Sequence, residues 1–487
     1  MHIVIIAPPY HGHLTSGASL GGALKKARGH SVTFVASAKG QRYAEREELD
    51  FVELVGHDQA MEEGDQRLAS LSGIDAVRCT SECLVHYATL LLRDLPGVLD
   101  TLEQPVDAIL LDEILYLAAT SVAEYKKIPF GVHATTVSVS HSTDVPPFTT
   151  TWDYRDAWWG RLRDTAGWMA LLWQCPISSR PVVNEWRLQH GLPEIPSGMK
   201  RDGGVIQVTQ QPYFLEFPKK PDTLPSHFFY TTPWHTDTTA DVTSESTDDN
   251  SSFPFDKLDA SKPLIYASLG TVQNQSKQVY QNICQACLEL LQEQHELQLV
   301  LALGKKGVAV EDIIPPMADN DNNNILVVDF APQLQLLDRA SMVITHCGMN
   351  TTLETMARGI PALAIPITND QPGVAARWRS LGAVMVLDSP AQATTVRIQQ
   401  AIRALLPEAS TYRQAAKTLQ RRLQEETPNL DETAHLIELA FSANQEAKEK
   451  KEGGSDYNNV PLTTNDSRAK EILKGKQVEP PKRKRIE

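Results

Sequence analysis

Apolar and polar positions along the chain alternate between strand-like and helix-like stretches. IVIIA at 3–7 predicts a buried strand near the N-terminus. LGGALKKAR at 20–28 predicts a helix that ends at Gly29, and SVTFVA at 31–36 predicts the next strand. DAILLDEI at 107–114 begins as another buried strand and leads into a helix. Strands that alternate with helices pair in parallel, so this half is predicted to be a doubly wound α/β domain.

A second series of strand-like runs follows an acidic, polar stretch at 235–262. That stretch is rich in Ser, Thr and Asp and nearly lacks large apolar residues, so it is predicted to be a linker or a long surface loop. Two Rossmann-like domains, 1–234 and 263–444, are therefore expected to face each other across a cleft. The Lys-, Glu- and Asn-rich remainder, 445–487, is predicted to be a disordered tail. The strand-like runs of the second half lie at 264–270, 297–304, 325–330, 342–348, 361–366 and 383–387.

Tryptophan is concentrated in one segment of the first half, at 150–190. Six of the eight tryptophans of the chain lie there. One interpretation is a helical insertion that packs its aromatic side chains on the sheet. The other is an aromatic-walled pocket for an apolar substrate, and the two are compatible. The second interpretation makes acceptor-binding residues of Trp152, Trp158, Trp159 and Trp168.

Charge and cysteine content narrow the class of protein. A net charge of −14 argues against a nucleic-acid partner, because phosphate binding needs a basic surface. Six cysteines in 487 residues do not form a disulfide framework, which favours a reducing compartment. The chain shows no targeting segment and no uninterrupted stretch of apolar residues long enough to span a membrane. A cytoplasmic protein is expected.

The stretch MVITHCGMNTTLETMARGIPALAIP, which begins at Met342, predicts a strand, a glycine turn and a helix. The strand ends at Thr345, and the helix starts near Asn350 and stops at Gly359. A strand that leads through a turn into a helix aims free backbone N–H groups at one point, where a phosphate fits. An ordinary capped turn explains this stretch equally well. The groups that would contact a diphosphate are His346, Gly348, Asn350 and Thr351.

Residues after the neighbouring strands match the other parts of a nucleotide-sugar. Phe330 and Gln333 suit a flat base, and Glu354 suits the hydroxyls of a ribose. Asp370 and Gln371 suit the hydroxyls of a sugar. In a doubly wound sheet such turns line the carboxyl edge, where ligands bind. A second glycine turn of the same half adds Ser268, Gly270 and Thr271.

With these motifs the chain resembles the family 1 glycosyltransferases of the GT-B fold, which transfer a sugar from a UDP-sugar to a small-molecule hydroxyl. SLGTVQN, APQLQLL and NDQPGVAARW are most similar to the bacterial branch of zeaxanthin and macrolide glycosyltransferases. Phe330 and Met349 stand where the family often has Trp, and Ser16 stands where it usually has Pro. The motif residues that carry the resemblance are Phe330-Ala331-Pro332-Gln333, His346-Cys347-Gly348-Met349-Asn350-Thr351, Glu354 and Asp370-Gln371.

The resemblance implies the inverting transfer of a hexosyl group, glucose in the first instance, to a hydroxyl of a small apolar acceptor. The UDP-sugar is then a co-substrate, and neither a cofactor nor a metal ion is expected. Two other functions are weighed beside this one. An epimerase-like sugar-nucleotide enzyme of the same fold would need extra carboxylates in the cleft, and a catalytically silent UDP-sugar-binding module would need no base.

APPYHGHLTSG at 7–17 brings two histidines close together. A metal site at His11 and His13 needs at least one more ligand, and the sequence shows no obvious third. The family resemblance makes His13 the general base, which suits the pKa of imidazole. Asp112 ends the strand AILLD, and parallel topology brings it to the same sheet edge as an orienting partner. No role is assigned to His11.

Overall fold

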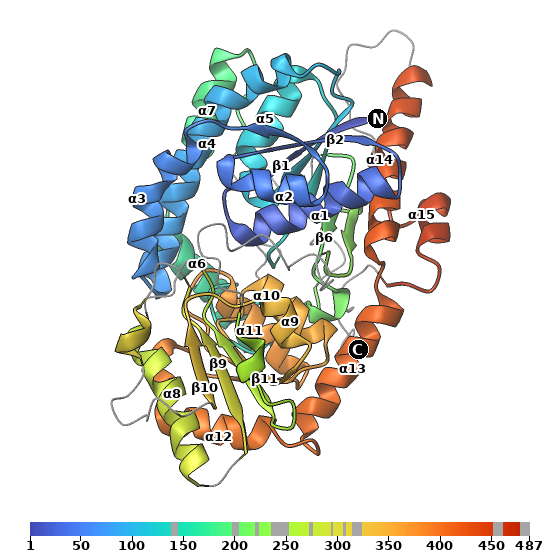
Figure 1. Cartoon of the computed structure of the whole chain (residues 1–487). Coiled ribbons are helices and arrows are strands. Elements are labelled where there is room, and N and C mark those ends of the chain that lie inside the picture. Colours follow the sequence, from blue (N-terminus) through green and yellow to red (C-terminus); the bar gives the residue numbers. More distant parts are fainter. Residues whose placement is uncertain are drawn as a thin grey trace.

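The computed structural model consists of two α/β domains, one above the other in Figure 1. The upper domain is built mainly from the first half of the chain and the lower domain mainly from the second half. The structure describes residues 1–137, 145–196, 204–219, 224–234, 253–271, 276–293, 296–304, 308–313, 324–450 and 461–477.

The first domain is organised around a seven-stranded parallel sheet with the order β3-β2-β1-β4-β5-β6-β7. Its first five strands follow the doubly wound Rossmann order, and the order reverses between β1 and β4. Both faces of the sheet are covered, which explains the uninterrupted apolar runs of β1 and β4. The strands are β1 (His2–Ile6), β2 (Ser31–Ala36), β3 (Asp50–Glu53), β4 (Ala108–Asp112), β5 (Phe130–Ala134), β6 (Gln207–Thr209) and β7 (Phe228–Tyr230).

The second domain repeats this plan with a six-stranded parallel sheet of order β10-β9-β8-β11-β12-β13. Here the order reverses between β8 and β11, the strands that precede the two predicted glycine turns. The predicted pair of Rossmann-like domains is thus confirmed. The strands are β8 (Leu264–Ser268), β9 (Gln298–Ala302), β10 (Ile325–Val328), β11 (Ala340–Thr345), β12 (Ala362–Ala364) and β13 (Val384–Val386).

The helices connect these strands. The first helix begins at His11 rather than at Leu20, because its N-terminal turns contain Gly, Ser and Thr as well as apolar residues and give no apolar periodicity. In the first half of the chain lie α1 (His11–Lys26), α2 (Gln41–Arg46), α3 (His57–Ala69), α4 (Gly73–Thr101), α5 (Tyr116–Lys126), α6 (Trp158–Gln174) and α7 (Arg180–Gln189). In the second half lie α8 (Lys277–Gln292), α9 (Gln333–Leu337), α10 (Met349–Ala357), α11 (Gln371–Ser380), α12 (Thr395–Leu405), α13 (Thr411–Glu426), α14 (Leu430–Lys450) and α15 (Ser467–Ile472).

After α13 the chain returns to the first domain, and this corrects the predicted domain boundary at 444 and the disordered tail at 445–487. Helix α14 packs along α1, with Ile437 and Phe441 buried in the first domain (Figure 1). Helix α15 packs against α14. Leu462 and Leu473 are buried in the same core, so these isolated apolar residues anchor the otherwise polar segment 461–477 to the first domain. Residues 451–460 and 478–487 of the predicted tail lie outside the described residues.

The predicted linker at 235–262 is described only from residue 253. Phe253 and Phe255 pack against the core of the second domain, so the end of the predicted linker belongs to that domain. The tryptophan-rich insertion contacts both domains. Helix α7 packs on α4 and α5 in the first domain, whereas the Asp153 Oδ1 accepts a 2.8 Å hydrogen bond from the Arg379 Nη2 of α11.

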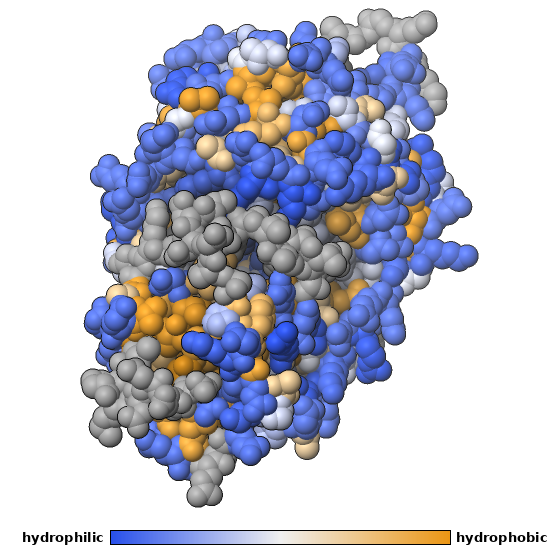
Figure 2. Space-filling view, in the orientation of Figure 1, coloured by the Kyte–Doolittle hydropathy of each residue, from blue (hydrophilic) through white to orange (hydrophobic). Residues whose placement is uncertain are grey.

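The surface seen in Figure 2 is largely hydrophilic, with apolar residues in separate patches. All six cysteines are free, and five of them are buried. In the part of the chain that the structure describes, no helix is both long enough and apolar enough to cross a membrane.

Candidate active site

His13 and Asp112 meet at the carboxyl edge of the first sheet, beside the point where the strand order reverses. His13 lies in the first turn of α1, directly after β1, and Asp112 is the last residue of β4. The His13 Nδ1 and the Asp112 Oδ2 are 2.7 Å apart. Because a carboxylate only accepts hydrogen bonds, Nδ1 carries the proton and Nε2 is left as the basic nitrogen.

Carboxylates around His13 set its proton affinity. Burial alone would lower the pKa of His13, but the attraction of Asp112, with smaller contributions from Asp370 and Glu113, raises that pKa above 6.5. Burial would raise the pKa of Asp112, yet the neighbouring His13 keeps it below its ordinary value. Asp112 is therefore ionised at neutral pH, and His13 is a stronger base than a free imidazole.

His11 faces in a different direction from His13. Its Nδ1 lies 2.6 Å from the Tyr43 hydroxyl of α2, and the two rings are 5.7 Å apart. The structure therefore separates the two histidines that the sequence places side by side: one contacts a buried carboxylate and the other contacts a tyrosine.

Three residues that sequence reasoning missed complete the surroundings of His13. Thr135 follows β5, and its hydroxyl oxygen lies 2.7 Å from the His13 Nδ1. His133 is the register partner of Asp112 on β5, and burial lowers its pKa, so it is neutral. Gln210 is fully buried and donates to the Thr135 carbonyl. No local motif marks these residues, but the end of a strand next to β4 is a signal that would have found Thr135.

The two domains touch at the N-termini of α1 and α10. The Asn350 Nδ2 donates to the Gly12 carbonyl at 3.1 Å, and the Gln210 Nε2 donates to the Asn350 Oδ1 at 2.8 Å. A Cβ atom added to Gly12 would lie 3.0 Å from the Asn350 side chain, so the glycine allows this approach. The predicted anion site of the second domain is thereby brought next to His13.

The predicted anion site is a strand-turn-helix unit, as expected. Cys347 has a φ of 64°, a left-handed conformation, and its N–H donates to the Thr345 hydroxyl. The His346 ring lies between two glycines, because a Cβ at Gly270 or at Gly348 would come within 2.6 Å of its Nε2. Burial lowers the pKa of His346 to about 4, so this imidazole is neutral. Helix α10 begins directly after Gly348 and presents its free N–H groups here.

Gln333, predicted for the base, and Glu354, predicted for the ribose, belong to one hydrogen-bonded cluster. The Gln333 Nε2 donates to Glu354 and to the Thr351 hydroxyl, and the Gln333 Oε1 accepts from the Tyr266 hydroxyl. Phe330 is partly buried and lies three residues before Gln333. The structure thus brings Gln333 of α9 and Glu354 of α10 together, and it adds Tyr266 of β8, which sequence reasoning missed.

Asp370 and Gln371 lie at the start of α11 and differ in their surroundings. The Oδ2 of Asp370 is buried without a hydrogen-bond partner among the described residues, and burial raises the pKa of this carboxyl group. The Oε1 of Gln371 accepts from the backbone N–H groups of Ile367 and Thr368, so it holds the preceding turn. Ser268 similarly accepts from the Gly270 N–H, and Thr271 is exposed beside it.

The four tryptophans predicted to bind an acceptor fall into two groups. Trp168 is buried and donates to the Val145 carbonyl, and Trp152 packs against Gly167. Trp158 and Trp159 are exposed at the start of α6. The insertion therefore combines a packed inner side, which contains Trp168, with an outward aromatic side, which contains Trp158 and Trp159.

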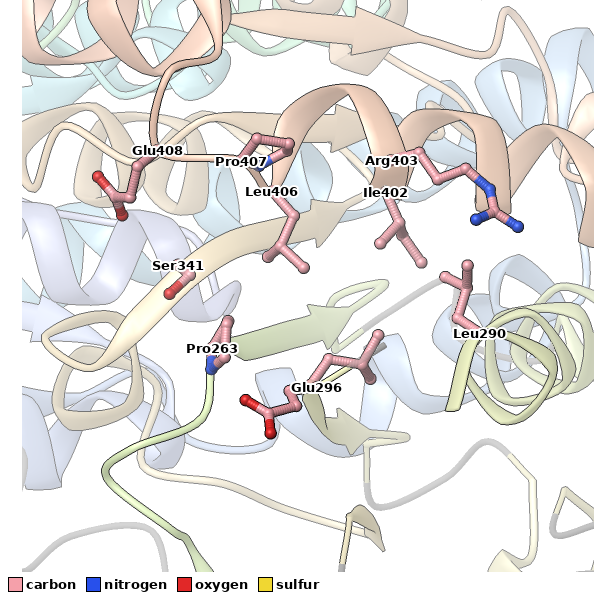
Figure 3. Close-up of a pocket in the computed structure, with 10 residues that line it drawn as sticks. Pro263, Leu290, Glu296, Ser341, Ile402, Arg403, Leu406, Pro407 and Glu408 are labelled. Carbon is pink, nitrogen blue, oxygen red and sulfur yellow. The ribbon is translucent and has the colours of Figure 1, made fainter. Parts of the chain in front are cut away.

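A separate cavity of about 320 Å³ lies where the strands of the second sheet begin, opposite to the carboxyl ends that the predicted nucleotide residues follow (Figure 3). Pro263 and Ser341, which lie at the beginnings of β8 and β11, line it together with Leu406 and Glu408 after α12. The predicted nucleotide residues follow the ends of these strands, so this cavity is not part of the candidate site. Among the described residues, no group of three or more side chains is arranged to hold a metal ion.

Comparisons with known proteins agree with this geometry. Residues 274–432 match the glycosyltransferase family 28 C-terminal domain. The chain is 30% identical over 380 residues to a zeaxanthin glucosyltransferase of Pantoea ananas, covering 77% of this chain and 82% of that protein. A zeaxanthin glucosyltransferase of Pseudescherichia vulneris is 29% identical, with 77% and 83% covered.

Solved glycosyltransferase structures share the two-domain GT-B fold. The glycosyltransferase of kitacinnamycin has a TM-score of 0.64 and 21% identity, over 90% of this chain and 99% of that chain. The spinosyn rhamnosyltransferase, solved with thymidine diphosphate, has a TM-score of 0.61 and 16% identity, over 90% and 100%.

The geometry predicts that Asp112→Asn lowers the pKa of His13. Without the carboxylate charge, the effect of burial dominates and the pKa falls from above 6.5 toward lower values. An NMR titration of labelled histidines measures the change. Asp107→Asn is the matched control, because Asp107 precedes β4, at the edge of the sheet opposite to His13, and accepts a hydrogen bond from the His2 backbone N–H. An unchanged His13 pKa in Asp112→Asn would contradict the pairing.

Proposed function

Since the chain belongs to the glycosyltransferase family of the zeaxanthin glucosyltransferases, we propose that it transfers a hexosyl group from a UDP-sugar to a small apolar acceptor. In this proposal the transfer inverts the anomeric centre. The transferred sugar is glucose, which the names of the two glucosyltransferase relatives support. The acceptor is a hydroxylated terpenoid, carotenoid, polyketide or phenolic compound.

The observation that carries this proposal is the His13–Asp112 pair beside the N-terminus of α10. The acceptor oxygen attacks the anomeric carbon while the His13 Nε2 takes the proton of its hydroxyl group. The bond between the anomeric carbon and the β-phosphate oxygen breaks on the opposite side, and UDP leaves. Asp112 stabilises the imidazolium that forms, and His13 then releases its proton to solvent.

The donor is held by groups of the second domain. The free N–H groups of α10 and the neutral His346 support binding of the diphosphate. The Gln333–Glu354 cluster supports binding of the ribose, and Phe330 offers a face for the base. The unpartnered Oδ2 of Asp370 supports a hydrogen bond from a sugar hydroxyl.

The two alternative functions have weaker support. A silent binding module has no use for an imidazole whose pKa is raised by a buried carboxylate. An epimerase-like enzyme needs an acid and a base at the sugar. The carboxylate nearest to His13 is that of Asp112, and it already accepts hydrogen bonds from His13 and from the Ile114 backbone N–H.

Substitutions of the two histidines test the catalytic assignment. His13→Ala is expected to lower the initial rate of transfer by about 10²–10⁴ and to leave UDP affinity nearly unchanged. Asp112→Asn also slows transfer, and the double variant is little slower than His13→Ala, because the aspartate acts through the histidine. Rates of acceptor-dependent UDP release at saturating UDP-sugar measure these effects. His11→Ala is the control, since His11 contacts Tyr43. Abolished turnover in His11→Ala with turnover retained in His13→Ala would refute the assignment.

Donor binding is expected to depend on the second domain. His346→Ala and Glu354→Ala each remove hydrogen bonds worth about 1–3 kcal/mol to a charged ligand, so both weaken UDP binding. Titration calorimetry with UDP measures the loss. Glu293→Ala serves as the control, because Glu293 is half exposed and pairs with Arg403 on the surface. If both site variants bind UDP as tightly as the unchanged protein, the nucleotide site lies elsewhere.

Transfer is expected to need no divalent metal ion, because the N-terminus of α10 and neighbouring side chains stabilise the leaving diphosphate. Initial rates measured after treatment with EDTA should equal those of the untreated enzyme. Complete loss of turnover in EDTA that magnesium restores would show that a metal ion takes part.

A further inference from the structure

One face of α6 exposes a row of large apolar side chains, interrupted by Thr165 and Ala166 between Leu162 and Met169. Trp158 is 74% exposed, Leu162 62%, Met169 66% and Trp173 82%. Their spacing of four, seven and four residues places them on one side of the helix, and Leu172 widens the row. These five residues are called the α6 stripe. The helix has 17 residues, so the stripe runs for about 25 Å at 1.5 Å per residue.

The α6 stripe differs from the rest of the described surface. Other exposed apolar residues are distant from one another in the chain: Val55 lies in the turn after β3, Leu188 on α7 and Val396 on α12. Residues 165–179 contain no charged side chain, although 22% of the chain is charged. Single exposed apolar residues are ordinary, whereas several on one face of one helix mark a surface that contacts something other than water.

The opposite side of α6 is fixed to the protein. Trp168 is buried, donates to the Val145 carbonyl and packs edge-on against Phe148. Phe148 in turn accepts a hydrogen bond from Gly373 of the second domain. At the far end of the helix, the Gln174 carbonyl accepts from the Arg78 Nε of α4. These contacts hold the helix in one orientation, with the stripe facing solvent.

The α6 stripe is connected to the proposed acceptor site by a short stretch of chain. The chain leaves β5 at Ala134 and passes Thr135 next to His13. Residues 138–144 lie outside the described residues, and the chain is described again from Val145, whose carbonyl accepts a hydrogen bond from Trp168. Only residues 136–144 lie between Thr135, which contacts the proposed base, and Val145, which supports the helix.

We propose that the α6 stripe docks on the surface of a lipid bilayer, from which the enzyme takes its acceptor. The proposal rests on the proposed function, because an apolar hydroxylated acceptor partitions into membranes. Indole, thioether and leucine side chains on an uncharged helix face are suited to the boundary between headgroups and acyl chains. Near the N-terminal end of the helix, the exposed Arg155 lies over the Trp159 ring, and the half-exposed Arg161 lies 3.9 Å from Asp156. Both guanidinium groups can also donate to lipid phosphates.

Vesicle flotation tests the docking surface without the need for turnover. The full-length protein is mixed with vesicles of phosphatidylcholine, or of phosphatidylcholine with phosphatidylglycerol, at low and high salt. Leu162→Ser/Trp173→Ser is expected to lower the partition coefficient by at least about tenfold, because two large side chains no longer enter the bilayer. Leu188→Ser/Val396→Ser is the matched control, with two comparably exposed residues on α7 and α12, and it should float like the unchanged protein.

Transfer rates provide the second readout. The stripe variant should glycosylate a water-soluble phenol at the rate of the unchanged protein and should lose activity only toward an acceptor dissolved in vesicles. Equal flotation of the stripe variant and the unchanged protein overturns the proposal. So does binding that occurs only with phosphatidylglycerol and is released by salt, or failure of the unchanged protein to float.

Light scattering tests whether a second copy of this chain, rather than a bilayer, covers the α6 stripe. A dimer that does not float, and that the stripe variant converts to a monomer, identifies the stripe as a contact between two copies and also overturns the proposal. Stripe-dependent flotation without UDP release from the UDP-sugar in the presence of any acceptor refutes the proposed function and supports the docking surface. Unchanged UDP affinity of the stripe variant verifies that its second domain is folded.

Discussion

Two helix N-termini meet head to head between the domains, and the candidate site depends on this meeting. Asn350 at the start of α10 donates to the Gly12 carbonyl at the start of α1. Both helix ends carry a positive partial charge, so their approach is unfavourable unless negative charge lies near them. The carboxylates of Asp112 and Asp370 supply part of that charge. A bound diphosphate would supply more, which links donor binding to the closeness of the two domains.

Two histidines of the site obtain opposite properties from their surroundings. His13 has a raised pKa because carboxylates outweigh burial, whereas His346 has a pKa of about 4 because burial dominates. One imidazole is thus prepared to gain a proton, and the other remains neutral near the place where a diphosphate would bind. The difference arises from the residues that surround each ring: Asp112 ends β4, the neighbour of β1, while glycines enclose His346 after β11.

The sequence predicted the parts of the site that follow from strand order and local motif. His13 and Asp112 come together because parallel strands bring their carboxyl ends to one edge, and both follow apolar runs that are easy to recognise. Gln210 and Thr135 were missed because their contacts join positions far apart in the chain. The return of α14 to the first domain was missed for another reason: helical periodicity identifies an apolar face but not the domain that covers it.

The contacts between the domains differ in what it costs to break them. Glu216 is buried with Arg377 and Lys219, each 2.9 Å from one of its oxygens, and the pKa of Glu216 is held at about 2. Removing one partner of such a buried pair typically costs about 3–5 kcal/mol, because a charge is left uncompensated. The neutral hydrogen bond between Asn350 and Gly12 contributes only about 0.5–1.5 kcal/mol. Truncation of Arg377 is therefore expected to destabilise the interface more than loss of the hydrogen bond between Asn350 and Gly12.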